Sequence, residues 1–225
     1  MKKKSTGSLL ALAIIIFVVF GCQKFKSNET QNTNVTSPSN NLKVENYNTN
    51  GNSTTSAAMP SSKAIAWELA NKLSMAAILY DLKGFESSDS LSKAKILAQE
   101  VGATVPVFPT KTGDKSKDTA AIMAYLLKDV NKNIGDSVKS KYGQEEAALF
   151  EMSLKSNVLL LIYAPGDSMG KTVAKVIRTN AKIANLPENL WMPAVSKIEG
   201  GASFDDVKTA ILEMQTSVGQ SLGKS

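Results

Sequence analysis

Histidine is absent from the 225 residues of the chain, and cysteine occurs only once, as Cys22. Without histidine, the protein cannot build a histidine-assisted nucleophilic triad, a histidine-ligated haem or most kinds of zinc site. A single thiol cannot form an intramolecular disulfide, so the folded part of the chain must be stabilised by packing alone. These absences predict no metal site and no cofactor.

Arginine is nearly absent as well, because Arg178 is the only one. The formal net charge is +6, and Lys2, Lys3 and Lys4 account for half of it. Residues 63–225 hold 20 basic and 18 acidic side chains, which leaves a net charge of only +2. A surface that binds phosphate groups normally carries clustered arginine and lysine. Nucleic acid is therefore not an expected partner.

The longest apolar run lies near the N-terminus, from Leu9 to Phe20, and Gly21 and Cys22 follow it. As a helix, these twelve residues would rise about 18 Å, whereas the hydrocarbon core of a bilayer is roughly 30 Å thick. The run is therefore short for a permanent membrane span. The three lysines before it supply the positive charge that holds the start of an exported chain in the cytoplasm.

This order of basic residues, apolar run, glycine and cysteine resembles a bacterial lipoprotein signal peptide. Val19-Phe20-Gly21-Cys22 fits that pattern at its aliphatic, glycine and cysteine positions, and departs from it at Phe20, where a smaller residue is usual. The resemblance implies that residues 1–21 are removed and that the Cys22 thiol then carries a diacylglycerol with fatty chains such as palmitate. The alternatives are an uncleaved membrane anchor, or cleavage elsewhere that leaves a free thiol.

The same resemblance implies an extracytoplasmic, lipid-anchored place in the cell envelope, with the membrane as partner through Cys22. Residue 23 is Gln rather than Asp, which favours the outer membrane in a bacterium with two membranes. Two or three fatty chains would give stable anchoring, because a single chain binds a membrane only marginally.

Residues 22–62 combine this cysteine with a segment that has few apolar side chains. Between residues 23 and 62, 22 of 40 positions are Asn, Ser or Thr. Such a composition cannot offset the entropy cost of ordering the chain. We predict a disordered tether with a root-mean-square reach of roughly 35 Å.

Residues 63–225 are long enough to form one domain with a substantial core. Apolar residues recur there at steps of three and four, and no stretch shows sustained alternation. The pattern predicts an all-α fold, an irregular bundle of six or seven helices. The residues expected to begin these helices as N-caps are Ser62, Asp89, Ser116 or Asp118, Asp167 or Ser168, and Ser203.

Three segments of this domain have a more specific interpretation. Val105–Pro109 contains two prolines and should be an extended apolar strap rather than a helix. The helix after it is expected to continue past a bend at Gly135 towards Gly143. Residues 145–163 are the most hydrophobic part of the domain and predict a central, covered helix, with a six-residue buried strand at Val158–Tyr163 as the alternative.

The residues Gly166 to Thr172 look like a phosphate-binding P-loop, but the spacing is wrong. Three residues separate Gly166 from Gly170, whereas the P-loop needs four so that its N–H groups curl round the phosphates. A helix cap at Asp167 and a solvated Lys171 explain the same residues. No nucleotide is an expected partner.

Glu151 is the candidate catalytic residue, because it lies between Phe150 and Met152 in the most hydrophobic segment. Burial there could raise its pKa towards that of a general acid, as glycan-cleaving enzymes require. The simpler interpretation is an ion pair with Lys155 one helical turn later. We favour the ion pair and assign no catalytic residue.

Two further patterns have ordinary explanations. Six methionines are dispersed through the domain and fit the core better than a copper(I) site. Trp191-Met192-Pro193 and the strap around Phe108 could together line an apolar groove, although core packing explains both better. The sequence thus predicts a lipid-anchored envelope protein whose helical domain binds or scaffolds, with a carboxylate-dependent hydrolase of envelope glycan as the alternative.

Overall fold

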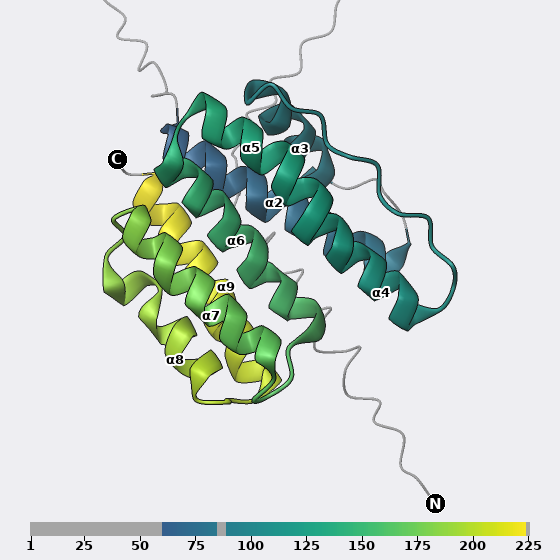
Figure 1. The fold of residues 1–225 in the computed structure, drawn as a ribbon, viewed down its shortest axis with the longest axis vertical. Coiled ribbons are helices and arrows are strands. Elements are labelled where there is room, and N and C mark those ends of the chain that lie inside the picture. Colours follow the sequence, from purple (N-terminus) through teal and green to yellow (C-terminus); the bar gives the residue numbers. More distant parts are fainter. Residues whose placement is uncertain (1–59, 85–88, 224–225) are drawn as a thin grey trace, which may run out of the picture. The chain divides into compact units, whose positions relative to one another are not determined.

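The computed structural model of this protein describes residues 60–84 and 89–223. The expected signal peptide, Cys22 and almost all of the expected tether lie outside these residues. Within them, all regular structure is helical, which confirms the all-α fold (Figure 1). The elements are α2 (Ser62–Lys83), α3 (Asp89–Glu100), α4 (Lys115–Ala124), η1 (Tyr125–Val130), α5 (Asn131–Lys141), α6 (Gln144–Ile162), α7 (Ser168–Ile183), η2 (Glu188–Leu190), α8 (Met192–Glu199) and α9 (Phe204–Leu222). Because α4, η1 and α5 are continuous, the described residues form 7 helices besides the short 3₁₀ turn η2.

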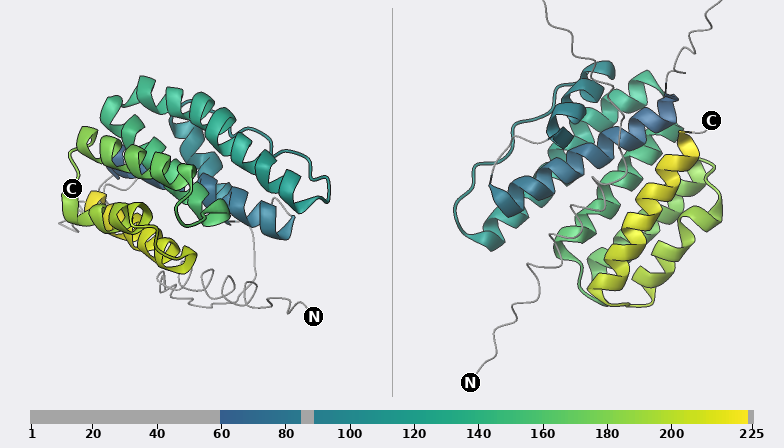
Figure 2. Two further views of the ribbon diagram at one scale, coloured as in Figure 1. Left: turned by 60° about the horizontal axis from the view of Figure 1, so that its bottom comes forward. Right: turned by 180° about the vertical axis from the view of Figure 1, so that it is seen from behind.

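Helix α6 is the central element, as its composition predicts. It packs against α2, α5, α7, α9 and η1. Figure 1 shows it running between α5 and α7, and Figure 2 shows the long α4–α5 helix and α9 on opposite sides of it. The alternative of a buried strand at Val158–Tyr163 is wrong, because α6 continues to Ile162. None of the described helices combines the length and the apolar character needed to cross a membrane.

The core divides into two clusters that share α2 and α6. Phe150, Leu154 and Val158 of α6 face the first cluster, which contains α3 and the long α4–α5 helix. Leu149 and Met152 face the second cluster, which contains α7, α8 and α9. Helix α6 therefore needs apolar residues on two sides, and this explains why its sequence lacks a single apolar stripe.

The long helix contains a π-helical segment, η1, in its middle. The core residues Ile122, Leu126, Val130, Ile134 and Val138 are at most 1% exposed and recur at a constant spacing of four. In an α-helix of 3.6 residues per turn, that spacing drifts by about 40° at each step. The wider i→i+5 turns of a π-helix offset the drift and keep these residues on one face. The helix continues through Gly135, as expected, and its π-helical segment lies before that residue, at Tyr125–Val130.

Three helices begin at the N-caps that the sequence predicts, and in one of them the cap is shifted by one residue. The side chain of Asp167 accepts a hydrogen bond from the Gly170 N–H, and Ser203 accepts one from Asp206. Helix α2 is capped by Ser61, one residue before the predicted Ser62.

The cap of α4 differs from the prediction, because Asp114 occupies it and accepts from the N–H groups of Ser116 and Lys117. Asp118 instead folds back on the loop before the helix. Its carboxylate accepts from the Thr112 N–H at 2.7 Å, the Thr112 hydroxyl at 2.8 Å and the Gly113 N–H at 3.2 Å. These hydrogen bonds, the one from the Thr112 N–H above all, hold the pKa of Asp118 below its usual value, although burial opposes ionisation.

The segment Val105–Pro109 is extended, as its prolines predict, and it is fixed by an aromatic stack. Phe108 stacks on Tyr80 of α2 with ring centroids 4.8 Å apart, and meets Tyr125 edge-on at 5.1 Å. The hydroxyls of both tyrosines donate to strap carbonyls, Tyr80 to Pro109 and Tyr125 to Pro106. The strap thereby joins α2 to the long helix.

Candidate functional site

Glu151 lies in α6 beside α7, and its carboxylate is held by two partners. One oxygen is 2.6 Å from the Lys155 Nζ, and the other accepts a hydrogen bond of 2.9 Å from the Asn180 Nδ2 of α7. Burial of the side chain opposes ionisation, but the hydrogen bonds from Lys155 and Asn180 and the charge of Lys155 outweigh it. The pKa of Glu151 therefore lies below its usual value.

A lowered pKa is the opposite of what the catalytic hypothesis requires. A glycosidase acid must hold its proton near neutral pH, and burial without a cationic partner produces that state. Here the carboxylate stays ionised and joins two helices. The ion pair with Lys155 that the sequence predicts is present, whereas Asn180 comes from another helix and was not foreseen.

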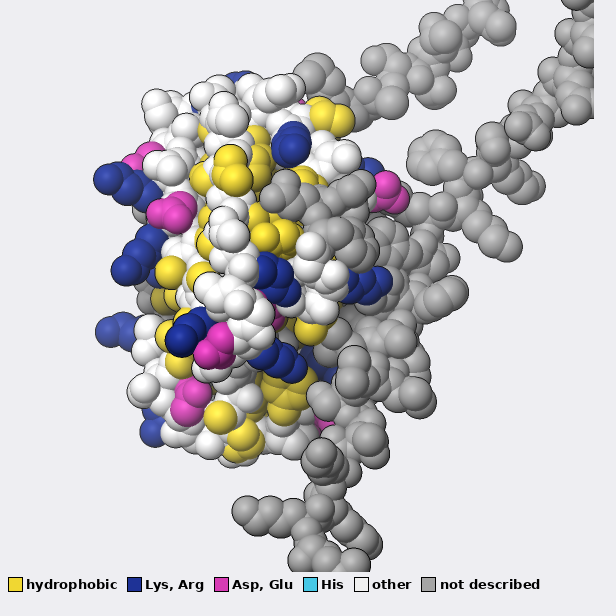
Figure 3. Space-filling view, turned by 90° about the vertical axis from the view of Figure 1, so that its right-hand side faces the viewer, with side chains coloured by type: hydrophobic (Ala, Val, Ile, Leu, Met, Phe, Trp, Pro, Cys, Tyr) yellow, Lys and Arg dark blue, Asp and Glu magenta, His cyan; other side chains and the backbone are white. Residues whose placement is uncertain are grey.

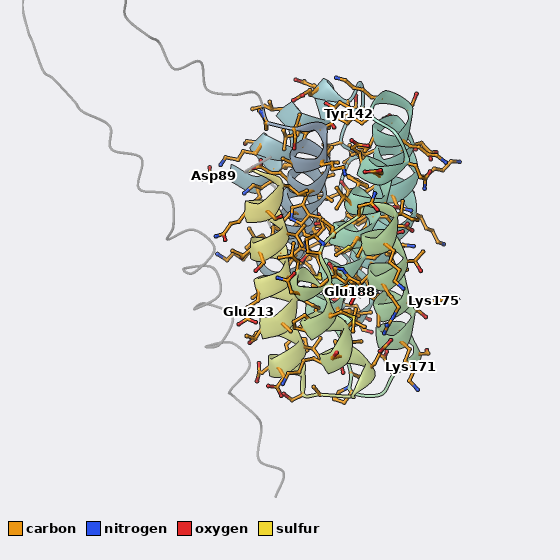
Figure 4. The ribbon with its side chains drawn as sticks, turned by 90° about the vertical axis from the view of Figure 1, so that its left-hand side faces the viewer. Asp89, Tyr142, Lys171, Lys175, Glu188 and Glu213 are labelled. Carbon is orange, nitrogen blue, oxygen red and sulfur yellow. The ribbon has the colours of Figure 1, made fainter. Side chains whose placement is uncertain are left out.

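The segment from Gly166 to Thr172 serves as a helix start. The Asp167 carboxylate occupies the Gly170 N–H, one of the donors that a phosphate would need. Gly170 is buried against Tyr163 and Ile198, so its backbone faces the core. Lys171 is exposed and points away from the body (Figure 4).

The two halves of the suggested apolar groove belong to different core clusters. Trp191 is 1% exposed and packs in the second cluster, whereas Phe108 is 7% exposed and packs in the first. The two apolar segments therefore form no joint groove.

Met152 and Met214 are buried core residues of the second cluster. The described residues contain no group of three or more acidic side chains that could hold a metal ion.

A hollow near the C-terminal end of α2 is too small for an organic ligand. It lies beside Tyr80, Pro109, Lys111 and Asp118 and has essentially no volume that a water-sized molecule could occupy, whereas small-molecule sites usually have roughly 300–1,000 Å³. The Lys111 Nζ donates to the Asp81 carbonyl and to the Tyr80 carbonyl, which also accepts from the Gly84 N–H at the end of α2. Lys111, two residues after the strap, therefore has a structural role at the end of α2.

The face that carries α3 and the strap offers few exposed apolar side chains. Ile96 is 66% exposed and Val107 is 85% exposed. Figure 3 shows hydrophobic side chains there interspersed with charged side chains of both signs, in the part of this face that the described residues form. Single exposed apolar residues of this kind are normal for a protein surface.

A buried polar network joins α6 to α9 inside the core. The Gln215 side chain donates to the Ser153 carbonyl and the Ser156 hydroxyl, and accepts from the Ser153 hydroxyl. Trp67 of α2 donates to the Gln215 carbonyl at 3.1 Å. Since each of these side chains bonds within the network, the network fixes the register of three helices and presents no group to a ligand.

Helix α7 carries a basic stripe that the sequence interpretation missed. Lys171, Lys175, Arg178 and Lys182 recur at steps of four, three and four, and α7 contains no acidic residue. At 100° per residue, these positions lie within an arc of about 60°. Figure 4 shows Lys171 and Lys175 projecting outward from the edge of the bundle. The spacing alone could have revealed the stripe.

Cys22, the expected site of lipid attachment, lies outside the described residues, so it remains a prediction from the sequence. No protein-family model, curated protein or solved structure matches this chain.

Proposed function

We propose that this chain is a lipid-anchored protein of the bacterial cell envelope, attached to a membrane through Cys22. The observation that carries the proposal is the order of residues 2–22, in which three lysines, twelve apolar residues, Gly21 and Cys22 follow one another. An apolar run too short for a permanent span, ending at the only cysteine, is typical of a lipoprotein signal. In a bacterium with two membranes, we favour the outer one.

We infer that the helical domain acts by binding or scaffolding. The ionised state of Glu151, paired with Lys155 and Asn180, supports this choice over glycan hydrolysis. The extensive core supports it too, because helices joined by two apolar clusters provide a rigid body on which surfaces are displayed. No observation favours the hydrolase, so we do not propose it.

The intact mass of the protein purified from the envelope of its own cells tests the anchor. We expect the mass of residues 22–225 with a diacylglycerol on the Cys22 sulfur, with or without a third, amide-linked acyl chain. The Cys22→Ser variant serves as the control and should lack the acyl mass. The mass of the whole chain, or of a chain cut elsewhere with a free thiol, would contradict the proposal.

A further inference from the structure

The basic stripe of α7 has three cations that lack an acidic partner. Arg178 is neutralised by Glu199 of α8, which accepts two hydrogen bonds from it, at 2.7 and 2.9 Å. Lys171, Lys175 and Lys182 are exposed and form no ion pair among residues 60–84 and 89–223. These three lysines are therefore available to an external anion.

Two acidic side chains beside α7 are already engaged. The Asp167 carboxylate caps the helix through the Gly170 N–H, and Glu151 binds Lys155 and Asn180. Figure 4 shows Glu188 near the middle of the face turned to the viewer, with Lys171 and Lys175 at its right-hand edge, and no ion pair joins Glu188 to these lysines among the described residues. The positive charge of the stripe is thus not cancelled by the side chains next to it.

The stripe is straight and stands on the outside of a helix. From residue 171 to residue 182 it extends about 16 Å along the axis. The buried face of α7, with Val173, Ile177 and Ala181, points into the second core cluster, so the lysines lie on the solvent side. A row of this shape fits a flat, diffuse anionic surface better than a single small anion.

We propose that this lysine stripe of α7 binds the anionic headgroups of a phospholipid membrane. A protein partner would need buried apolar anchors, and lysine is depleted at protein interfaces. The large hydrophobic side chains that are exposed among the described residues, Leu82, Ile96 and Val107, all lie outside α7. Polar Thr172 and Thr179 flank the lysines instead. A surface with positive charge but no exposed large apolar side chain fits a layer of anionic headgroups, where each lysine contributes about 1 kcal/mol to the free energy of binding.

This inference rests on the proposed function, because the lipid on Cys22 would hold the domain close to a bilayer. Anchoring turns a weak contact into an intramolecular one with a high effective concentration. Three lysines then suffice to orient the domain with α7 against the membrane, although they would bind only weakly on their own.

Vesicle sedimentation tests the stripe separately from the anchor. The probe is the mature chain, residues 22–225, with Cys22→Ser, so that no acyl chain contributes to binding. At low ionic strength, we expect it to sediment with vesicles of phosphatidylglycerol and phosphatidylcholine in equal parts, and not with phosphatidylcholine alone. Added salt should release it.

The variant Lys171→Gln/Lys175→Gln/Lys182→Gln should bind the anionic vesicles about a hundredfold more weakly, since each of the three lysines near the surface contributes about fivefold. The matched control, Lys93→Gln/Lys95→Gln/Lys115→Gln, removes three exposed lysines from α3 and α4, and should bind nearly as tightly as the parent. Circular dichroism checks that both variants remain helical.

Three results would overturn the inference: no binding of the parent chain, equal binding to neutral vesicles, or equal losses in both triple variants. Because the probe lacks the acylated cysteine, each of these leaves the intact-mass test of the anchor unaffected. An absent acyl mass would in turn leave the vesicle result standing.

Discussion

Two helical glycines, Gly135 and Gly170, face aromatic side chains at different distances. A Cβ at Gly135 would lie 3.6 Å from the Phe150 ring, which is ordinary contact. A Cβ at Gly170 would lie 3.1 Å from the Tyr163 ring and 3.4 Å from Ile198. The Tyr163 hydroxyl donates to the Ala202 carbonyl, so its ring cannot move freely.

We therefore expect alanine to have opposite effects at the two positions. Gly135→Ala should raise the free energy of unfolding by about 0.5–1 kcal/mol, because alanine loses less backbone entropy in a helix. Gly170→Ala should lower it by about 1 kcal/mol, because the crowding outweighs the same gain. Urea unfolding of both variants measures the difference, and equal stabilisation would contradict the close packing of α7 on Tyr163.

Glu151 should make the protein sensitive to acid. Its pKa lies below the ordinary value of 4.5, so the ionised form stabilises the fold. This stabilisation is complete above pH 4.5 and is lost as the pH falls through the lower folded-state pKa. In Glu151→Gln, the free energy of unfolding should fall less steeply below pH 4.5 than in the parent chain. Unfolding by urea across that range measures both slopes, and parallel curves would show that the pair with Lys155 and Asn180 contributes nothing.

Among the elements, the strap offers a matched pair of neighbouring residues. Phe108 is 7% exposed between Tyr80 and Tyr125, whereas Val107 is 85% exposed. Phe108→Ala should cost about 3–5 kcal/mol, because it leaves a cavity between α2 and the long helix. Val107→Ala should change the stability by less than about 0.5 kcal/mol. Thermal unfolding followed by circular dichroism separates the two, and a Phe108→Ala variant as stable as Val107→Ala would refute this role of the strap.

Elements whose signals are local could be predicted from the sequence. Asp167 and Ser203 cap their own helices, and the prolines of Val105–Pro109 exclude a helix whatever surrounds them. The sequence also offers Asp118 as the cap of α4, but in the structure the Asp118 carboxylate accepts a hydrogen bond from Thr112 in the loop before the helix. Asp114 caps the helix instead.

Features that depend on the partner helix could not be predicted. Constant four-residue spacing fits a slowly drifting α-helix as well as a π-helical segment, so η1 has no signature of its own. At the candidate site, the pair of Glu151 with Lys155 follows from their spacing, whereas Asn180 joins it from α7. Trp191 and Phe108 are both apolar and near prolines, and only the fold places them in separate clusters.

At the scale of the whole molecule, α2 and α6 take part in both core clusters, so the clusters should unfold together. Both tryptophans, Trp67 and Trp191, lie in the second cluster, whereas Phe108 lies in the first. Phe108→Ala should therefore shift the unfolding transition seen by tryptophan fluorescence as far as the transition seen by circular dichroism. A fluorescence transition that stays at its original denaturant concentration would show that the second cluster is stable without the first.

The attachment of the whole molecule rests on Cys22, and labelling of growing cells with radioactive palmitate tests it most directly. We predict that label enters the wild-type protein and is absent from the Cys22→Ser variant, because no other residue of the chain carries a thiol. Label missing from the wild type, or retained by the serine variant, would contradict the lipid anchor.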